Sequence, residues 1–577
     1  MDNKNVEVTY DVTLDVTLNK NANKKNINGK VSIDVNIDDN IDDNKVFNSN
    51  TINIVWFRRD LRLEDNESVY LATSNQNPTL FIFCVDPWFY SNNMVGDKRV
   101  NFLFESLVDL DNELQKLGSN LTILEGNTIE SFSELITTLN KFNIQAQLYF
   151  NTDVQVQYGI DRDNAIRSLW SAKNCSYIES LASFMIKVKD KSDMSNWGRK
   201  YYNYQQSPLH PHPRIITEEN FQSGIQVKPL VNSFDIKQLQ LENIQTPLDL
   251  LNRFKSKNNI NSRIYQGGST NAHIIVNDFI KHRSVGYNWR QSRPWQAQQG
   301  GVSQLSPHIT FGTISPRQVY QLSRDSRQKT DRKHAFALKS FEERLRWRDH
   351  FFNKLLLDPS IAWKNHYHEY DSVYNLDELD EEKNQYFIHW KNGTTGFPLI
   401  DASMRQLNRD GYMNFRMRAM NATFLTINCG ISWHHGAEYF MTQLVDGDIA
   451  INHWQWQMQA GITNPFSTTF RIYNPNSNIS EKDPTLEYIH YWCPEYNSCK
   501  SPLEVIECSK PMLDFKSTRS TNGKIISNIR ETVRNRLAIK YNITLPLKQT
   551  KSRPKSKTKT TPNDKKLIDE TSIDLFI

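Results

Sequence analysis

Long apolar runs are absent from this 577-residue chain: the longest, residues 80–85, is far shorter than the roughly 20 residues that a membrane-spanning helix needs. We therefore expect no membrane partner. Cysteine is scarce as well, with six in the chain and no Cys-x-x-Cys pair. This scarcity favours reduced thiols in an intracellular protein, and only Cys493, Cys499 and Cys508 are close enough together to leave a metal or cluster site open.

Targeting signals are also missing from the first 30 residues, which contain neither the apolar stretch of a secretory signal nor the Arg-rich, acid-poor composition of a transit peptide. We therefore expect a nuclear or cytoplasmic protein. The net charge is only +5, so binding to a polyanion has to come from a local basic face rather than from the charge of the whole chain.

Composition divides the chain into five segments. Residues 1–50, rich in Asn, Asp and Lys, are predicted to form a disordered extension. In residues 51–180, short β-rich runs alternate with helix-length stretches, which predicts an α/β domain with a parallel sheet. Prolines cluster in the predicted connector at 181–254. Apolar spacings of three and four predict an all-helical domain over 255–510, followed by a C-terminal extension, residues 511–577.

The C-terminal extension carries the basic run KQTKSRPKSKTK at 548–559. A solvated tail is the simplest interpretation, and a nuclear address or a non-specific phosphate contact stays open. No Gly-rich phosphate loop follows the first predicted strand, which argues against a nucleotidyl-transferring α/β enzyme.

The segment at 444–475 contains the first candidate site. On a helix, Asp448, Asn452 and Trp456 would recur every four residues and share one stripe. Burying a carboxylate and an amide is costly unless something polar lies against them, and two tryptophans nearby make full exposure unfavourable. The pattern therefore indicates a site for a planar, polar ligand.

A second candidate site lies in RLRWRDHF at 344–351. Arg344, Trp347 and Arg348 are three and four residues apart and would cover one helix face. Guanidinium groups beside an indole hold phosphates and stack on bases or rings. A simple ion pair with a neighbouring carboxylate is the alternative for each arginine.

Together with VWFRRDLRLEDN (55–66), QLSPHITFGTISPRQ (304–318) and GTTGFPLIDASMRQLNRDGYMNFRMR (393–418), these two segments resemble the DNA photolyases and cryptochromes. Five motifs in the same order make the resemblance specific, and it extends over residues 52–503. It implies an α/β antenna domain followed by a helical domain that holds FAD, in which blue light drives electron transfer. A second, antenna chromophore of the folate or deazaflavin type is left open.

The resemblance also implies roles for individual residues. Ser303 and Ser306 match the hydroxyls that bind the FAD phosphates. The implied cofactor-binding set is Tyr287, Ser303, Ser306, Arg348, Arg418, Asp446, Asp448 and Asn452. Asn452 matches the residue that faces flavin N5, and Trp456 and Trp433 match the first two members of an electron relay. No tryptophan occupies residues 364–389, so Trp363, Tyr370 or Tyr374 is left for the third relay position.

On the substrate side, the resemblance implies contacts to a DNA lesion from Trp347, Arg344, Arg416 and Met458. Arg344 stands where relatives carry a carboxylate, and Met458 where they carry a tryptophan. We predict light-driven, FAD-dependent repair of pyrimidine dimers in DNA by a monomer, and the alternative is a cryptochrome photoreceptor without repair activity. A flipped base costs a few kcal/mol to extrude, and less where a lesion has already damaged the stacking.

Overall fold

The computed structural model describes residues 51–75, 77–91, 94–154, 156–180, 197–215, 230–231, 234–239, 241, 244–258, 265–467 and 470–545. The extension predicted to be disordered (1–50), the basic run at 548–559 and much of the predicted connector lie outside the described residues. Within the part of the chain that the structure describes, no helix is long and apolar enough to cross a membrane.

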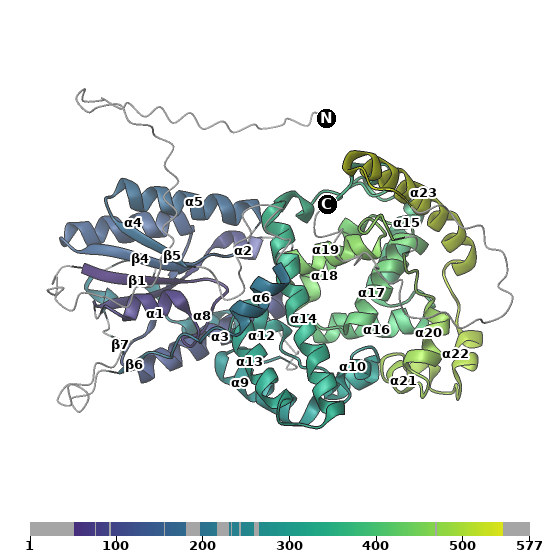
Figure 1. The fold of residues 1–577 in the computed structure, drawn as a ribbon, viewed down its shortest axis with the longest axis horizontal. Coiled ribbons are helices and arrows are strands. Elements are labelled where there is room, and N and C mark those ends of the chain that lie inside the picture. Colours follow the sequence, from purple (N-terminus) through teal and green to yellow (C-terminus); the bar gives the residue numbers. More distant parts are fainter. Residues whose placement is uncertain are drawn as a thin grey trace. The chain divides into compact units, whose positions relative to one another are not determined.

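One six-stranded sheet has the order β5-β4-β1-β2-β3-β8. Strands β1, β4 and β5 of this sheet are labelled in Figure 1. Its strands are β1 (Thr51–Phe57), β2 (Thr79–Val85), β3 (Leu121–Glu125), β4 (Gln145–Asn151), β5 (Ser176–Ser180) and β8 (Ile244–Gln245). The first five are parallel, which confirms the α/β prediction, but β8 pairs antiparallel with β3. The sheet is therefore mixed, because the predicted connector contributes its edge strand. Two short strands, β6 (Arg214–Ile215) and β7 (Leu230–Val231), pair separately.

Helices cover both faces of the sheet. They are α1 (Glu67–Thr73), α2 (Pro87–Ser91), α3 (Asp97–Lys116), α4 (Thr128–Lys141), α5 (Gln157–Ala172) and α8 (Pro247–Lys257). Figure 1 shows α4 and α5 on one side of the sheet and α1, α3 and α8 on the other. In β1, Ile52, Ile54 and Trp56 pack towards α4 and α5, whereas Val55 and Phe57 pack towards α1, α3 and α8. Side chains alternate across a strand, so both faces of β1 are apolar and both are covered.

The predicted connector does not simply run over the surface. It contains α6 (Trp197–Gln205), in which Trp197 and Tyr201 are buried. The indole Nε1 of Trp197 donates to a carboxylate oxygen of Asp349 at 3.2 Å. The aromatic side chains of this short helix thus attach it to the helical region.

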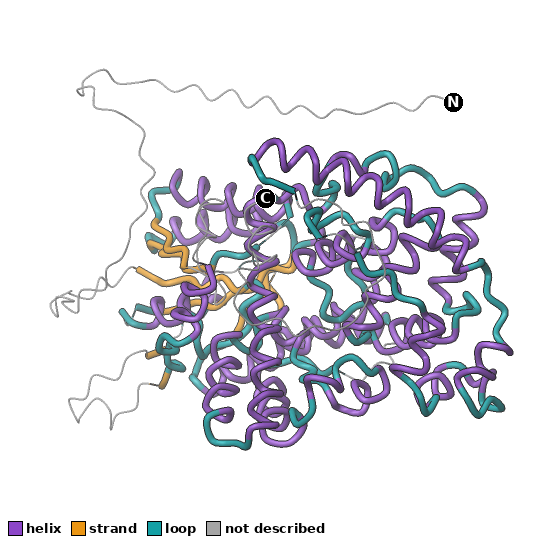
Figure 2. Tube along the Cα trace, turned by 45° about the vertical axis from the view of Figure 1, so that its right-hand side comes forward, coloured by secondary structure: helices purple, strands orange, loops and turns teal. Residues whose placement is uncertain are grey.

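No strand occurs between residues 265 and 545 in the described segments, which confirms the all-helical prediction (Figure 2). The first helices are α9 (Ser269–Asp278), α10 (Tyr287–Arg290), α11 (Pro294–Gln296), α12 (Ser306–Phe311), α13 (Pro316–Arg327), α14 (Arg332–Leu357) and α15 (Glu381–Asn392). They are followed by α16 (Pro398–Asp410), α17 (Phe415–Thr423), α18 (Trp433–Gln443), α19 (Ile449–Gln459), α20 (Pro475–Lys482), α21 (Glu487–Trp492), α22 (Pro502–Cys508) and α23 (Phe515–Tyr541).

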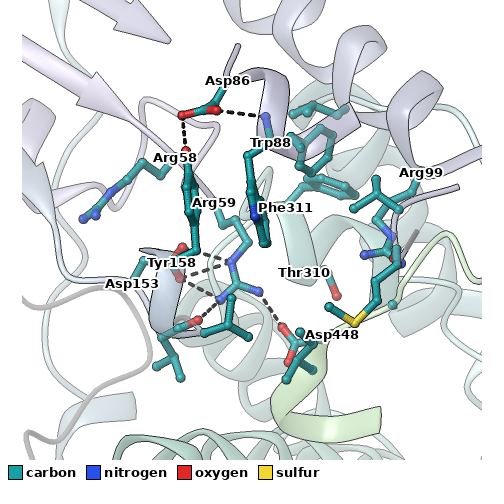
Figure 3. A pocket seen from close by; sticks show the side chains of 18 of the residues that line it. Arg58, Arg59, Asp86, Trp88, Arg99, Asp153, Tyr158, Thr310, Phe311 and Asp448 are labelled. Atoms are coloured by element: carbon teal, nitrogen blue, oxygen red, sulfur yellow. Dashed lines mark hydrogen bonds and ion pairs between the residues drawn. The ribbon is translucent and has the colours of Figure 1, made fainter. Parts of the chain in front are cut away.

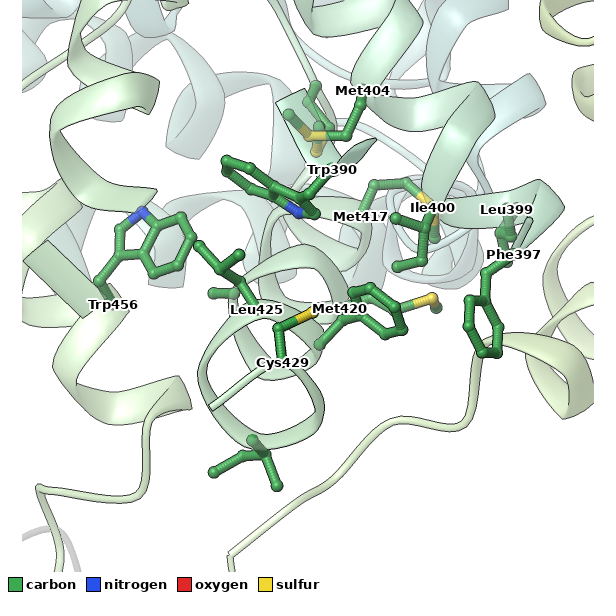
Figure 4. Packing of buried hydrophobic residues seen from close by; sticks show 14 of the residues in the cluster. Trp390, Phe397, Leu399, Ile400, Met404, Met417, Met420, Leu425, Cys429 and Trp456 are labelled. Atoms are coloured by element: carbon green, nitrogen blue, oxygen red, sulfur yellow. The ribbon is translucent and has the colours of Figure 1, made fainter. Parts of the chain in front are cut away.

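The largest apolar core lies among α15 to α19 and includes Trp390, Met404 and Trp456 (Figure 4). Helix α23, which begins inside the predicted C-terminal extension, contributes Ile526, Val533 and Leu537 to this core. The core therefore reaches well beyond residue 510.

Direct contacts join the sheet region to the helical region. A buried ion pair connects Asp65, after β1, to Arg317 in α13. At Gly96, before α3, a Cβ atom would lie 1.8 Å from the carbonyl oxygen of Thr442, so only glycine permits this approach. These contacts hold the segment after β1 against α13 and the start of α3 against the end of α18.

Candidate functional site

A cavity of about 290 Å³ lies between α10, α12, α14, α17 and α19, and we call it the inner cavity. All of the residues predicted to bind the cofactor line it, together with Arg344 and Trp456. They are Tyr287, Ser303, Ser306, Arg348, Arg418, Asp446, Asp448 and Asn452. Residues from 287 to 456 thus meet around one space, as the resemblance to the photolyases and cryptochromes implied.

The stripe predicted at 448–456 needs one correction. Asp448 is not inside the helix, because its backbone is extended (φ −133°, ψ 124°) and it forms the N-cap of α19. Its carboxylate accepts from the backbone N–H of Ile451 at 3.4 Å, and a capping carboxylate stabilises a helix start. Asp448, Asn452 and Trp456 nevertheless all line the inner cavity.

The Arg418–Asp446 ion pair forms one wall of the inner cavity. Nη2 of Arg418 lies 2.9 Å from Asp446 Oδ2, and Nε donates to the carbonyl oxygen of Met413 at 2.7 Å. Burial by itself would lower the pKa of Arg418, but the charge and hydrogen bond of Asp446, together with Tyr412 and Tyr265, raise it. The guanidinium therefore stays charged and fixed in orientation.

Helix α14 supplies two further cations to the wall. Burial lowers the pKa of Arg348 to about 10, and Asp448 and Asp349 oppose this shift. Burial raises the pKa of Tyr287 to about 12 and the positive charge of Arg344 opposes this shift. The guanidinium carbon of Arg344 lies 5.6 Å from the centroid of the Phe415 ring. Within the described residues Arg344 has no ion pair with Glu343, so the cation remains at the cavity.

Asn452 and Trp456 are held from the side of α18. The Asn452 amide donates to the carbonyl oxygen of Ala437 at 3.0 Å, and its Oδ1 accepts no hydrogen bond from any described residue. A Cβ atom at Gly436 would lie 2.2 Å from the Trp456 ring, so the glycine makes room for the indole. The Trp456 ring lies 5.0 Å from Phe440 and 6.1 Å from Trp390, measured between ring centroids.

The other relay candidates differ in exposure. Trp433 is buried, its indole donates to Asn365 at 2.8 Å, and its ring stacks on His434 at 3.8 Å. Nε2 of His434 lies 3.0 Å from the carbonyl oxygen of Trp363, whose side chain is 40% exposed. Tyr370 and Tyr374 are buried. Among the three candidates for the third relay position, only Trp363 combines exposure with a contact to the residue that stacks on Trp433.

A second cavity of about 530 Å³, the outer cavity, adjoins the first. Both cavities are lined by Arg344, Arg348, Phe415, Ile451 and Gln455. Gln455 Oε1 is buried in this shared wall with no hydrogen-bond partner among the described residues. An acceptor in that situation is expected to meet a donor from a ligand.

Three of the four predicted substrate residues line the outer cavity: Trp347, Arg344 and Met458. Trp347 is 37% exposed and stacks on Phe351 with centroids 6.1 Å apart. Arg416 lies outside the walls of both cavities, because its Nη1 donates to the Tyr473 hydroxyl at 2.6 Å and its guanidinium lies over that ring.

The sequence analysis did not predict a third cavity, which we call the interface cavity. It has a volume of about 220 Å³ and lies between the sheet and helical regions (Figure 3). Arg59, at the end of β1, binds Asp153 at 2.6 Å and Asp448 at 2.7 Å. Asp448 lines both this cavity and the inner one. The signal available in the sequence was the position of Arg59 at the carboxyl end of a parallel strand, where ligands of such sheets bind.

The side of the interface cavity opposite Asp448 is aromatic. The rings of Trp88 and Tyr158 stack with centroids 4.4 Å apart and nearly parallel planes (5°). Asp86 accepts from the Tyr158 hydroxyl at 2.7 Å and from the backbone N–H of Trp88 at 2.9 Å (Figure 3). These hydrogen bonds hold the two rings against the cavity.

The cysteines left open as a metal site do not form one among the described residues, where no group of three or more His, Cys, Asp or Glu side chains comes together. The Cys493 thiol lies 3.8 Å from the carbonyl oxygen of Pro398, and burial raises its pKa above its ordinary value. Such a thiol is protonated and unreactive at neutral pH.

Comparison with protein families gives two matches along the chain. Residues 53–207 match the family model described as DNA photolyase, and residues 341–525 match the FAD binding domain of DNA photolyase. The second range contains both arginines of α14, the Arg418–Asp446 pair and α19.

Curated relatives carry both kinds of name. A deoxyribodipyrimidine photo-lyase of Synechococcus is 28% identical over 77% of this chain and 87% of its own length. Cryptochrome DASH of Synechocystis is 28% identical over the same shares. Cryptochrome-1 of Aedes aegypti is 27% identical over 84% of this chain and 94% of its own.

Solved structures share the fold. An archaeal photolyase from Sulfolobus tokodaii, described with two FAD molecules, has a TM-score of 0.63 and 27% identity, covering 82% of this chain and 99% of that one. A class III photolyase from Agrobacterium tumefaciens has a TM-score of 0.66 at 22% identity, covering 85% of this chain and 100% of that one.

Proposed function

The chain belongs to the DNA photolyase/cryptochrome family and binds FAD, and on that premise we propose that it uses light to repair pyrimidine dimers in DNA. The residues of the inner cavity fit FAD. Ser303, Ser306 and Arg348 suit a diphosphate, Asp446 and Asp448 suit ribose or ring N–H groups, and the Asn452 amide can meet the edge of a flat ring. FAD, when bound and reduced, supplies the electron that splits a dimer under light.

The observation that most supports this proposal is the wall that the inner and outer cavities share. A dimer held in the outer cavity would be separated from the FAD site only by side chains that line both spaces, including Arg344 and Gln455. Close approach of donor and acceptor is the first requirement of such a reaction. A cavity of about 530 Å³ lined by Trp347, Phe351 and Met458 suits the flat or puckered rings of an extruded pyrimidine pair.

In this proposal Trp347 stacks on the extruded dimer, and Arg344 places a positive charge where negative charge develops on it. The guanidinium lies over the ring of Phe415, which also lines both cavities. Trp456 and Trp433, with Trp363 as the exposed end, carry electrons towards the FAD site and keep the cofactor reduced. Phosphate contacts outside the cavities supply salt-dependent affinity for DNA.

The direct test is repair. Purified, reduced protein is mixed with single- and double-stranded oligonucleotides that contain one cyclobutane dimer, half of each mixture is illuminated, and restored thymines are counted. We expect light-dependent repair that disappears in the dark. Photoreduction of FAD without any repair would contradict the proposal.

A blue-light photoreceptor without repair activity is the second candidate. It is favoured by Arg344, which stands where a carboxylate would hydrogen-bond a base, and by relatives named cryptochrome at 27–28% identity. In that case damaged and undamaged DNA would bind equally well. We favour repair because the outer cavity retains Trp347 beside a wall shared with the FAD site.

A further inference from the structure

The indole N–H of Trp433 begins a chain of hydrogen bonds that ends at the protein surface. Its Nε1 donates to the side-chain oxygen of Asn365 at 2.8 Å, and the amide nitrogen of Asn365 donates to a carboxylate oxygen of Asp371 at 2.7 Å. The same nitrogen also donates to the carbonyl oxygen of Tyr374 at 2.7 Å. Trp433 is buried, whereas Asp371 is exposed. One amide thus connects a buried indole to an exposed carboxylate.

Contacts from two helices hold the segment that carries Asn365. From α19, the side-chain oxygen of Gln457 accepts from the backbone N–H of His366 at 2.8 Å. From α23, Arg536 forms an ion pair with Glu369. A hydrogen-bond acceptor that is fixed in advance needs no reorganisation when charge develops on its donor. The geometry at the indole N–H is therefore set before any charge arrives.

Two imidazoles that pack against Trp433 are neutral. The ring of His434 stacks on the indole with centroids 3.8 Å apart, and the ring of His453 lies at 87° to it with centroids 5.7 Å apart. Burial lowers the pKa of His434 to about 4 and the pKa of His453 to about 3. Both rings are therefore uncharged at neutral pH, and neither opposes a positive charge on the indole.

Trp390 offers a comparison, because its ring lies 6.1 Å from that of Trp456. Its Nε1 also donates to an amide, that of Asn421, at 3.1 Å. The nitrogen of that amide donates to the neutral Ser403 hydroxyl and to a backbone carbonyl. Among the described contacts, a carboxylate therefore stands behind the indole–amide bond of Trp433 and none stands behind that of Trp390. Two indoles are chemically alike, so such surroundings decide which one is easier to oxidise.

We propose that Asn365 and Asp371 are positioning residues of the electron relay, which stabilise positive charge on Trp433 and so draw it away from Trp456. This inference rests on the relay in the proposed function and not on repair. In the step, Trp456 has lost one electron to photoexcited, oxidised FAD, and one electron then passes from Trp433 to Trp456. Trp456 becomes neutral again and Trp433 becomes a cation radical. No bond breaks, and the N–H proton stays on Trp433 because the amide of Asn365 is too weak a base to accept it.

Two effects favour the charge on Trp433. Oxidation makes the indole N–H a stronger donor, and charge-assisted hydrogen bonds are roughly twice as strong as neutral ones. The Asp371 carboxylate polarises the amide of Asn365 in the same direction, because linked hydrogen bonds strengthen one another. Asp371 is exposed, so solvent and salt weaken its effect. We therefore expect Asn365 to matter more than Asp371.

Single variants should weaken this stabilisation. Asp371→Asn keeps the size of the side chain and removes its charge. The electron should then return from FAD to Trp456 more often, and the yield of the Trp433 radical after a flash should fall about 2- to 5-fold, the range of an exposed charge interaction. Asn365→Leu removes the acceptor altogether, so we expect a fall of about 10-fold or more. The Trp433 signal is the part of the flash-induced absorption that Trp433→Phe lacks.

A double variant should reverse the effect. N365D/D371N exchanges the two side chains, keeps the net charge and places the carboxylate directly at the indole N–H. The yield of the Trp433 radical should recover at least to that of the wild type, and part of the radical should lose its proton to the carboxylate. Cation and neutral tryptophan radicals differ in absorption, so the spectrum reports which group faces Nε1. Glu378→Gln removes an exposed carboxylate of the same chain segment and should leave yield and spectrum unchanged.

A measurement in the dark checks the hydrogen-bond chain by itself. In protein with ¹⁵N-labelled tryptophan, the indole N–H signal of Trp433 is assigned by its loss in Trp433→Phe. We expect its proton NMR shift to move to lower frequency in Asp371→Asn, because the hydrogen bond weakens, and to stay in place in Glu378→Gln. FAD content and circular dichroism of each variant check that the fold is kept.

The inference and the proposed repair activity can fail separately, because repair is measured with FAD that has been reduced chemically. A Trp433 yield that is unchanged in Asp371→Asn, or that does not recover in N365D/D371N, would overturn the inference even if dimers are repaired. Absence of repair, with the expected yields and NMR shifts, would reject the proposed repair and sustain the roles of Asn365 and Asp371.

Discussion

Around the inner cavity several polar side chains are held by partners inside the protein, whereas around the outer cavity two of the aromatic side chains stay partly open to solvent. Asp446 binds Arg418, Asp448 binds Arg59, and Asn452 binds a backbone carbonyl. In the outer cavity Trp347 and Phe415 are 37% and 44% exposed. A site with fixed partners suits a resident cofactor, and an open aromatic site suits a substrate that enters and leaves.

The largest effect on FAD binding and stability is expected when an ion-pair partner in the wall of the inner cavity is removed. In Asp446→Ala the Arg418 guanidinium loses its counter-charge in a largely buried wall, so we expect loss of bound FAD and destabilisation on the order of 3 kcal/mol. Flavin absorbance of the purified protein and urea unfolding measure the two effects.

The matched control is Glu495→Ala, which removes an ion pair of similar length (2.7 Å to Arg405) from an exposed position. Exposed pairs contribute about 0–1 kcal/mol, so FAD should remain bound. Equal FAD loss in both variants would show that Asp446 has no special place in the cofactor site.

Trp456→Phe should slow photoreduction of FAD by more than an order of magnitude while FAD stays bound, because phenylalanine fills most of the space but is much harder to oxidise. Trp433→Phe should act in the same direction. Flash photolysis at equal FAD content provides the measurement.

Trp454→Phe is the neighbouring control, since Trp454 lines the outer cavity and not the inner one. Unchanged photoreduction in Trp456→Phe would direct attention to Trp390, whose ring lies 6.1 Å from that of Trp456, as part of another route.

Trp347→Ala should weaken binding of a dimer-containing strand about 10- to 100-fold, since stacking on an aromatic side chain contributes about 1–3 kcal/mol per base. Photoreduction should not change, which separates the two cavities functionally. Titration of labelled oligonucleotides measures the affinity. Trp289→Ala, at an exposed tryptophan outside both cavities, should leave binding unaltered.

Arg344→Ala should lower the repair rate several-fold without releasing FAD, because a charge is lost from the shared wall but the Arg418–Asp446 pair remains. Arg344→Lys should recover part of the rate by restoring the charge. Arg346→Ala serves as the control, since Arg346 lines neither cavity and lies over the Trp197 ring. If the repair rate is the same in all of these variants, Arg344 does not contribute to the reaction.

The smallest expected effect is a pH dependence of the free energy of unfolding, caused by Asp349. Burial raises the pKa of Asp349, behind the wall of the outer cavity, to about 7, opposed by Arg348 and the Trp197 hydrogen bond. A carboxyl group with a raised folded-state pKa stabilises the fold fully below its unfolded pKa of about 4, and this contribution declines as the pH rises to about 7.

Wild-type protein should therefore lose stability between pH 5 and pH 7 relative to Asp349→Asn, whose amide cannot ionise. Urea unfolding at several pH values measures the difference. The exposed control Asp161→Asn should follow the wild-type profile, and parallel profiles for wild type and Asp349→Asn would contradict the prediction.

Residue spacing predicted helix α14, which lies between the inner and outer cavities. It did not predict which residues of α14 line which cavity. Arg344, Trp347 and Arg348 do lie on one side of α14, as intervals of three and four require. The two arginines line both cavities, and Trp347 lines only the outer one. Spacing on one helix cannot specify this division, because it depends on the helices packed opposite.

The interaction partners of Arg416 and Asp448 could not be predicted from the sequence either. The sequence identified both as candidates by their place in a motif. Arg416 instead bonds to Tyr473, 57 residues further along the chain, and Asp448 is bound by Arg59, which precedes it by 389 residues. Such partners are chosen by tertiary packing, and one sequence contains no local signal for them.

The sequence by itself determined the alternation of strands and helices and the helical second half, because periodicity is a local property of the chain. The set of residues around the inner cavity followed from the resemblance of its motifs to the photolyases and cryptochromes. Tertiary structure decided that β8 closes the sheet edge, that Arg59 connects two cavities through Asp448, and that α23 packs its apolar face into the helical core. These features depend on which surfaces meet when segments hundreds of residues apart bury their apolar faces together.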